Sequence, residues 1–353
     1  MKYFIIEGCP DGEYNATNKA REDVETILKK NGITPFYVQT EKGIQQNKLM
    51  KWKQFITYNK NKKVWDKALS ELKSEDIVFI QYPILNTALN IINVIKKYNE
   101  KGIRFVAIIH DLDSLRFKGN CSNMQYNRIC KEDKELLNEM DQIICHNSSM
   151  KKVLVDLGNS SDKIVELKIF DYLIDFEPKK IKRTKKDPII IAGNLSPFKA
   201  KYISYLKDLN TSYNLYGVGY IDEIGGDNIS YKGKFKPDEL INHLEGSFGL
   251  VWDGESIDTC VGGFGGYLRY NNPHKVSLYL TAGIPVIVWK ESAMAKFIEK
   301  NNLGITVNNL NEIEEKVNKL TDKEYNEICD NIKAVSKRLR NGEFLADAIN
   351  KIK

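Results

Sequence analysis

Apolar positions along this chain form two series of short runs, and segments with helical spacing separate the runs. Near-continuous apolar runs bounded by polar residues predict strands that are buried on both faces of a sheet. In the first half they cover residues 2–6, 34–38, 76–81, 104–109, 142–145 and 163–169. The intervening segments repeat their apolar residues as one face of a helix does. This alternation indicates a doubly wound α/β domain with a parallel sheet.

The alternation starts again at residue 189. Strands are expected over residues 189–192, 213–216, 229–232, 248–252, 284–289 and 303–307. Helices are expected over residues 200–209, 237–244, 293–301, 311–320 and 322–339, and a glycine-rich loop over residues 262–266. The first-half helices include a lysine-rich one over residues 52–72, with a break at 59–63, and another over residues 86–98.

A charged segment bracketed by two prolines, residues 177–188, lies between the halves. Its simplest interpretation is an exposed linker, and the alternative is a basic patch that faces a membrane or an acceptor. We expect a first Rossmann-like domain over residues 1–176 and a second over residues 189–340, with the linker 177–188 between them. A last helix, in residues 341–353, is expected to pack back on the first domain. Ligands are expected in the cleft between the carboxyl edges of the two sheets.

Composition agrees with two globular domains. Of the 353 residues 42% are hydrophobic, and the longest apolar runs are far shorter than the roughly 20 residues of a membrane span. The first residues form a strand start without a signal-peptide core, so we expect a cytoplasmic protein. The six cysteines are scattered and are expected to be free thiols. The net charge of +6 is compatible with phosphate-bearing ligands or an anionic surface.

One stretch, residues 271–289, combines the strongest structural and chemical signals. Pro273 is placed for a first helical position, Gly283 for a helix end, and the β-branched run after it for a buried strand. The start of such a helix offers unpaired N–H groups and a positive dipole end. Lys275 lies in the same turn, so we expect an anion to bind there.

The chain resembles bacterial nucleotide-sugar glycosyltransferases of the GT-B fold, and within them the β-1,6-galactofuranosyltransferases and the glucosyltransferase 3 of serine-rich-repeat adhesin glycosylation. The residues that carry the resemblance are Phe248-Gly249-Leu250-Val251-Trp252, Asn272-Pro273-His274-Lys275, Ala282-Gly283-Ile284-Pro285-Val286-Ile287-Val288, His110-Asp111-Leu112 and Asn18-Lys19-Ala20-Arg21-Glu22-Asp23. The resemblance implies that the second domain holds the UDP part of the donor and the first domain the acceptor. It also implies self-association.

The resemblance and the expected strand ends together define the candidate donor site. Lys275 and a basic residue of the first turn, Lys199, would neutralise the charge on the leaving diphosphate. The full donor-binding set is Lys275, His274, Asn272, Lys199, Asn194, Tyr216, Gly217 and Asp253. The alternative for His274 and Asn272 is helix capping, and the alternative for Tyr216 is strand-end packing instead of a wall for uracil.

Asp111 and His110, at the carboxyl end of a buried strand, are the candidate catalytic residues. An inverting transfer needs one general base that takes the proton of the acceptor hydroxyl. Asp111 is the first candidate base, and His110 is either its partner or a satisfied core histidine. Lesser candidates are Asp113, Glu13 and Asp11, and the candidate acceptor-binding residues are Gly12, Asn15 and Lys19. The broad retaining group has a glutamate at about the place of Leu278, so a retaining mechanism does not follow from the fold.

We expect no metal and no cofactor, because Asp253-Gly254-Glu255 lacks the separated carboxylates that bridge a metal to a diphosphate. The function expected is transfer of a hexosyl group, galactofuranose first, from a UDP-sugar to a glycan hydroxyl on a lipid or protein. Glucosyl transfer from UDP-glucose to a protein-linked GlcNAc is the runner-up. A UDP-sugar epimerase and a non-catalytic transferase subunit are the alternatives of other classes. Neither nucleic-acid binding nor a membrane span is expected, and peripheral membrane contact is left open.

Overall fold

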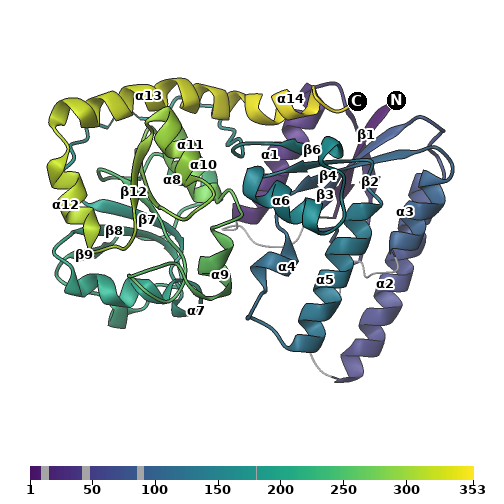
Figure 1. Ribbon diagram of the computed structural model, residues 1–353, viewed down its shortest axis with the longest axis horizontal. Coiled ribbons are helices and arrows are strands. Elements are labelled where there is room, and N and C mark those ends of the chain that lie inside the picture. Colours follow the sequence, from purple (N-terminus) through teal and green to yellow (C-terminus); the bar gives the residue numbers. More distant parts are fainter. Residues whose placement is uncertain (9–15, 42–47, 86–90, 180) are drawn as a thin grey trace.

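The computed structural model describes the chain except residues 9–15, 42–47, 86–90 and 180 (Figure 1). Two parallel sheets of six strands each form the framework. The first sheet has the order β2-β1-β3-β4-β5-β6, with β1 Lys2–Glu7, β2 Thr34–Val38, β3 Ile77–Tyr82, β4 Arg104–Ile109, β5 Gln142–Cys145 and β6 Ile164–Glu166. The second has the order β12-β11-β10-β7-β8-β9, with β7 Ile189–Asn194, β8 Tyr213–Val218, β9 Ile229–Tyr231, β10 Gly249–Val251, β11 Val286–Trp289 and β12 Gly304–Val307. The α/β architecture expected for each half is confirmed.

Helices cover both faces of the first sheet. They are α1 Ala16–Lys30, α2 Lys48–Leu69, α3 Ile91–Asn99, α4 Asp113–Arg116, α5 Asn123–Asn138 and α6 Ser148–Asp156, with a short 3₁₀ turn, η1, at Ser161–Lys163. The break expected at residues 59–63 is wrong, because α2 continues through them and Asn61 instead bonds to the backbone of Glu41 at 2.8 Å. Residues 86–90 of the expected helix 86–98 lie outside the described part of the chain.

The second domain carries shorter helices around its sheet. They are α7 Pro197–Ala200, α8 Pro237–Leu240, α9 Gly262–Tyr267, α10 His274–Thr281, α11 Ala295–Asn301, α12 Glu312–Lys319, α13 Asp322–Asn341 and α14 Glu343–Ile349, with 3₁₀ segments η2 Lys201–Asp208 and η3 Asp222–Ile224. The α-helix expected over residues 200–209 is thus mainly 3₁₀. The glycine-rich loop expected at 262–266 is wrong, since these residues form α9. Pro273 is the N-cap of α10 and not its first helical residue.

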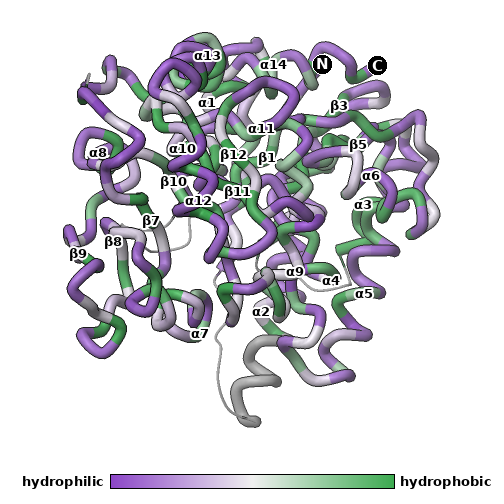
Figure 2. Tube along the Cα trace, turned by 60° about the vertical axis from the view of Figure 1, so that its left-hand side comes forward, coloured by the Kyte–Doolittle hydropathy of each residue, from purple (hydrophilic) through white to green (hydrophobic). Residues whose placement is uncertain are grey.

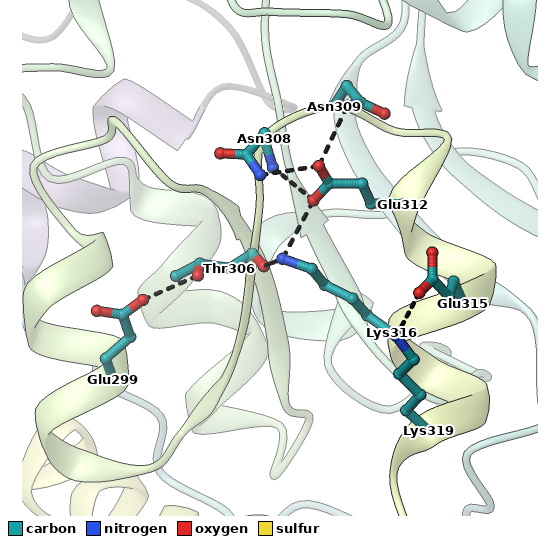
Figure 3. A network of polar contacts seen from close by, with 8 residues as sticks. All are labelled: Glu299, Thr306, Asn308, Asn309, Glu312, Glu315, Lys316 and Lys319. Carbon is teal, nitrogen blue, oxygen red and sulfur yellow. Dashed lines mark hydrogen bonds and ion pairs between the residues drawn. The ribbon is translucent and has the colours of Figure 1, made fainter.

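Local signals explain where the last helices begin and end. The Thr321 hydroxyl and the Glu324 carboxylate form a capping box at the start of α13. On α12, Glu312 accepts from the side chain and backbone N–H of Asn308 and pairs with Lys316 at 3.1 Å (Figure 3). Gly342, at φ 76°, ends α13 and turns the chain into α14.

The last segment of the chain returns to the first domain, as Figure 1 shows for α14 beside α1. A Cβ at Gly342 would lie 2.5 Å from Cγ1 of Ile27 in α1, so the two helices approach closely there. The Asp171 carboxylate accepts from the backbone N–H groups of Phe344 and Leu345 at 3.1 and 2.8 Å. These contacts connect α14 to the segment that leaves the first sheet.

The core is continuous across the two domains. Apolar residues follow the strands and the inner helix faces, and polar residues cover the outer loops (Figure 2). One buried cluster runs from Phe4 and Phe170 into the second domain, and Tyr267 of α9 is buried in the cluster of the first domain. The domains are therefore held together by shared apolar packing.

Within the described residues, no helix is long and apolar enough to cross a membrane.

Two basic side chains of the expected linker are bound to the second domain. Arg183 donates to the carbonyl oxygens of Gly246 and Leu244 at 3.0 and 2.9 Å, and Lys185 donates to that of Leu320. Burial lowers the pKa of Arg183. These two cations stabilise the chain crossing, which leaves fewer basic groups of this segment for a membrane or an acceptor.

Candidate active site at the domain junction

The carboxyl ends of β7, β8 and β10 meet at one edge of the second sheet, and α10 begins there. Lys275 lies in the first turn of α10, and its Nζ donates to Oδ1 of Asp253 at 2.9 Å. Their side chains are only 15% and 12% exposed. Strand β7 comes so close that a Cβ at Gly193 would lie 3.2 Å from Cε of Lys275. The ammonium group is thus fixed beside the free N–H groups of a helix start.

A second lysine, Lys199 of α7, lies near the same carboxylate. The attraction of Asp253 raises the pKa of Lys199, but burial and the repulsion of Lys275 and Arg116 outweigh it and leave this pKa below its ordinary value. Arg116 belongs to the first domain, where its Nη1 pairs with Oδ2 of Asp111 at 2.8 Å. Three cations from both domains therefore share three carboxylates, since Arg116 also lies 3.9 Å from Oδ1 of Asp113. The cations are placed to bind an anion such as a diphosphate.

Asn272 was expected to contact the donor, but in the structure its side chain hydrogen-bonds to the first domain. Its Nδ2 donates to the carbonyl oxygens of His146 and Lys168 at 2.8 and 3.0 Å, and its Oδ1 accepts from Nδ2 of Asn147 at 2.8 Å. Its backbone N–H donates to Nδ1 of His146 at 2.9 Å. Because the amide is 3% exposed and fully hydrogen-bonded, Asn272 joins the two domains and has no group left for a donor.

His274, the next candidate, has an unused ring. It stacks on Phe170 with a centroid distance of 5.0 Å, and the centroid of the Tyr172 ring lies 6.2 Å away. Neither ring nitrogen has a hydrogen-bond partner among the residues that the structure describes. Burial lowers the pKa of His274 to about 4. The ring is therefore neutral near pH 7 and offers one donor and one acceptor to a ligand.

The candidates on β7 and β8 divide into core and edge positions. Tyr216 is 1% exposed, and its hydroxyl accepts from the backbone N–H of Glu245 at 3.0 Å, so its ring belongs to the core and cannot be a wall for uracil. Gly217 has φ 138°, and a Cβ there would lie 1.8 Å from the carbonyl oxygen of Gly193. Asn194 is exposed and accepts from the N–H of Ser196, which shapes the turn into α7.

In the first domain, His110 and Asp111 follow β4 and lie at the junction. They contact different partners. Nε2 of His110 lies 2.7 Å from Oε1 of Gln81, and its ring stacks on Phe170 at 5.5 Å. Burial holds the pKa of His110 well below its ordinary value. Burial raises the pKa of Asp111, while Arg116 and the hydroxyl of Tyr267 lower it. His110 is thus a satisfied core histidine, and Asp111 is already paired with a cation.

Lys19, expected to contact the acceptor, has all its bonds made within the protein. Its Nζ pairs with Asp23 at 2.7 Å and with Asp238 of α8 at 3.0 Å, and donates to the carbonyl oxygen of Leu173 at 2.6 Å. Burial lowers the pKa of Lys19, but the two carboxylates together outweigh burial and raise this pKa above its ordinary value. Lys19 is therefore a second bridge between the domains. The other two acceptor candidates, Gly12 and Asn15, lie outside the described residues, as do Asp11 and Glu13.

The sequence pattern missed a cavity of about 310 Å³ at the carboxyl edge of the first sheet. It opens between the ends of β1, β2 and β3 and the start of α1, and it is lined by Ile5, Ile6, Glu7, Gly8, Asn18, Arg21, Glu22, Glu25, Tyr37, Gln39, Gln81 and Leu85. Glu7 is the last residue of β1, and its side chain is almost fully buried. Its place after an apolar strand and before Gly8 was the one signal that could have identified it.

Comparisons with known proteins cover both domains. Residues 2–169 match the N-terminal domain of the glucosyltransferase 3-like family, and residues 189–352 match its C-terminal domain. The chain is 35% identical over 288 residues to the β-1,6-galactofuranosyltransferase WbbI of Escherichia coli K12, covering 80% of this chain and 81% of that one. It is 28% identical over 288 residues to glucosyltransferase 3 of Streptococcus parasanguinis, covering 79% of each chain.

Solved structures share the arrangement of the two domains. The complex of Anabaena HepE with UDP and glucose has a TM-score of 0.57 at 12% identity and covers 99% of this chain and all of that one. The apo form of the lipopolysaccharide outer core galactosyltransferase WaaB has a TM-score of 0.59 at 14% identity, with 99% of each chain covered. At such identities the likeness concerns the fold, and it confirms the expected GT-B arrangement.

Proposed function

Because the chain belongs to the glucosyltransferase 3-like family of glycosyltransferases, we propose that it transfers a hexosyl group from a UDP-sugar to a hydroxyl of a glycan. The observation that supports this most is the cation cluster of Lys275, Lys199 and Arg116, which lies where a helix start and both domains meet. A diphosphate bound there would place its sugar at the junction, between the two sheets.

Galactofuranose is the proposed hexosyl group. The identity of 35% to a galactofuranosyltransferase, against 28% to a glucosyltransferase 3, favours UDP-galactofuranose over UDP-glucose as the donor. Glucosyl transfer to a protein-linked GlcNAc is the second candidate. Both reactions use a UDP-sugar, so both require the same residues to bind the diphosphate.

Lys275 acts on the leaving group in this proposal. As the bond between the anomeric carbon and the diphosphate oxygen breaks, negative charge grows on that oxygen, so a fixed cation lowers the barrier more than it stabilises the bound donor. Asp253 holds the ammonium group in place before the donor binds. The N–H groups at the start of α10 add a positive dipole end. Asn194, Gly217 and the unused ring of His274 are the nearby positions proposed to contact the donor.

We propose that this charge neutralisation needs no metal ion. Asp253 already pairs with Lys275, and Glu255 is exposed and separated from it by one glycine. Two lysines can take the place of a divalent cation on the diphosphate. Turnover should therefore be unchanged in excess EDTA. Loss of turnover in EDTA, with recovery on adding magnesium or manganese, would overturn this point.

A donor panel tests the function. Thermal unfolding is followed with UDP, UDP-galactofuranose, UDP-galactose and UDP-glucose, since a ligand that binds only the folded state raises its stability. We expect UDP and one UDP-sugar to raise the unfolding temperature, and UDP to be released once acceptor is added. Conversion of the UDP-sugar without acceptor would indicate an epimerase. Binding to a partner transferase without UDP release would indicate a non-catalytic subunit.

Self-association and peripheral membrane contact stay proposals that the resemblance and the charge pattern motivate. Sedimentation velocity distinguishes a monomer from an oligomer. Sedimentation with anionic vesicles tests the membrane contact, which should weaken with salt if the basic segment 177–188 carries it.

A further inference from the structure

Glu7 has a buried carboxylate that is only half used. Its Oε2 accepts from the backbone N–H of Leu85 at 3.0 Å, and Nη1 of Arg21 lies 3.9 Å from the same oxygen. Its Oε1 has no hydrogen-bond partner in the part of the chain that the structure describes, although the side chain is 5% exposed. A buried carboxylate oxygen without a partner costs free energy. Such a group calls for an explanation, and a ligand in the adjacent cavity is one.

The surroundings of Glu7 define what the cavity can hold. Its volume of about 310 Å³ is at the lower end of the roughly 300–1,000 Å³ of small-molecule sites. Glu7, Glu22 and Glu25 outnumber the one guanidinium, Arg21, so a phosphate would be repelled. The remaining lining combines polar side chains with the apolar side chains of Ile5, Ile6 and Leu85. This chemistry fits a neutral sugar ring with several hydroxyls.

A row of rings connects this cavity to the cation cluster. Gln81, in the cavity wall, bonds to His110, and His110 stacks on Phe170 at 5.5 Å. Phe170 stacks in turn on His274 at 5.0 Å, and His274 immediately precedes Lys275. Arg21 gives a second link, because it lies 3.9 Å from Glu7 and also interacts with Asp111, which pairs with Arg116 of the cation cluster. The cavity and the cation cluster therefore both border the domain junction.

We propose that Glu7 is the general base of the transfer and that the sugar acceptor binds in this cavity, an inference that rests on the proposed function. The carboxylate of Glu7 takes the proton of the acceptor hydroxyl. The hydroxyl oxygen forms the new bond to the anomeric carbon, and the bond from this carbon to the diphosphate oxygen breaks. Its electron pair leaves with UDP, whose charge Lys275 offsets. The configuration inverts, and Glu7 then loses the proton to water.

The environment of Glu7 suits this task better than that of the two residues expected from the sequence. Burial raises the pKa of Glu7 to about 7, while the N–H of Leu85 and Arg21 oppose the shift only in part. A base is most effective when its pKa lies near the working pH. Asp111 is paired with Arg116 at 2.8 Å, and the ring of His110 is hydrogen-bonded to Gln81.

The test compares wild type with Glu7→Gln, which keeps the size of the side chain and removes its basicity. UDP-galactofuranose and UDP-glucose serve as donors, and octyl glycosides of glucose, galactose and N-acetylglucosamine serve as acceptors. Donor hydrolysis, in which water replaces the acceptor, is measured in the same samples. We expect kcat to fall by roughly 10²- to 10⁴-fold, and the Kd of UDP to stay within about twofold because Lys275 is intact.

Two further variants separate chemistry from structure. Glu312→Gln changes a carboxylate (Figure 3) on α12, which lies at the edge of the second domain far from the first (Figure 1), and this variant should turn over as wild type. Glu7→Asp keeps a base and should retain part of the activity that Glu7→Gln loses. The wild-type rate should rise with pH to a plateau above about pH 7, and the residual rate of Glu7→Gln should lack this dependence.

The outcomes distinguish this inference from the proposed function. If wild type binds UDP and transfers sugar, but Glu7→Gln turns over at a similar rate or keeps the same pH profile, Glu7 is not the base. Glu7 is also not the base if Glu7→Gln loses UDP binding together with turnover, because the effect of the substitution is then structural. If wild type neither binds a uridine nucleotide nor releases UDP, the proposed function itself fails.

Discussion

The effect of replacing Lys275 with methionine can be estimated from the geometry of its ion pair with Asp253. Methionine keeps the length and most of the apolar stem but removes the charge. At the Nζ–Oδ1 distance of 2.9 Å, the attraction to Asp253 is about 6 kcal/mol for an effective dielectric constant near 20. Most of this is offset by the desolvation of both groups. Lys199 also stays near Asp253 and compensates part of the lost charge.

We therefore expect Lys275→Met to lower the free energy of unfolding by about 1–3 kcal/mol, which leaves the variant folded. Its effect on the donor is larger. A hydrogen bond to a charged group contributes about 1.5–3 kcal/mol, so the Kd of UDP should rise about 10- to 100-fold. The charge that develops in the transition state adds a further loss in kcat of roughly 10²- to 10³-fold.

Calorimetric titration with UDP and a UDP-release assay measure these effects. Lys316→Met is the matched control, because Lys316 makes a comparable ion pair with Glu312 at 3.1 Å on α12 (Figure 3). The control should lose some stability and no UDP affinity. If Lys275→Met binds UDP and turns over like wild type, the assignment of the phosphate site to the start of α10 is refuted.

Two further predictions concern stability. Asn272→Ala removes three buried hydrogen bonds to the other domain, with the amide of Asn147 and the carbonyl oxygens of His146 and Lys168, and should lower the free energy of unfolding by about 2–4 kcal/mol, measured by urea denaturation; an unchanged midpoint would contradict its bridging part. Glu7 has a folded pKa of about 7, above its ordinary 4.5, so the native state binds more protons between these pH values and wild type loses stability as pH rises through this window. The free energy of unfolding of Glu7→Gln relative to that of wild type should therefore be higher at pH 8 than at pH 5, by at most about 3 kcal/mol. An equal difference at the two pH values would contradict the raised pKa.

The sequence was sufficient for the strands, since a parallel sheet buried on both faces leaves nearly uninterrupted apolar runs. It also placed Lys275 in the first turn of a short helix, because Pro273 and Gly283 mark the two ends of that helix. The error at α9 has a packing reason. Glycines lower helix propensity, but a Cβ at Gly265 would lie 2.8 Å from the carbonyl oxygen of Asp253, so close packing at this position of the helix requires glycine.

The rest of the site depends on contacts between residues far apart in the chain. Asn272 looked like a ligand or a cap until the structure paired it with Asn147, 125 positions earlier. Glu7 ends a strand like many polar residues, and only the tertiary fold buries its carboxylate beside a cavity. The local sequence pattern predicts which residues lie at a sheet edge. It does not predict which of their polar groups already have hydrogen-bond partners there.

Product analysis tests the central claim most directly. The protein is incubated with UDP-galactofuranose and with UDP-glucose, together with the octyl glycosides, and the products are identified by mass spectrometry and NMR. We predict equimolar UDP and an acceptor one hexosyl unit heavier, with the configuration at the transferred carbon inverted. An intact acceptor with unchanged UDP-sugar, although the protein is folded, would contradict the account.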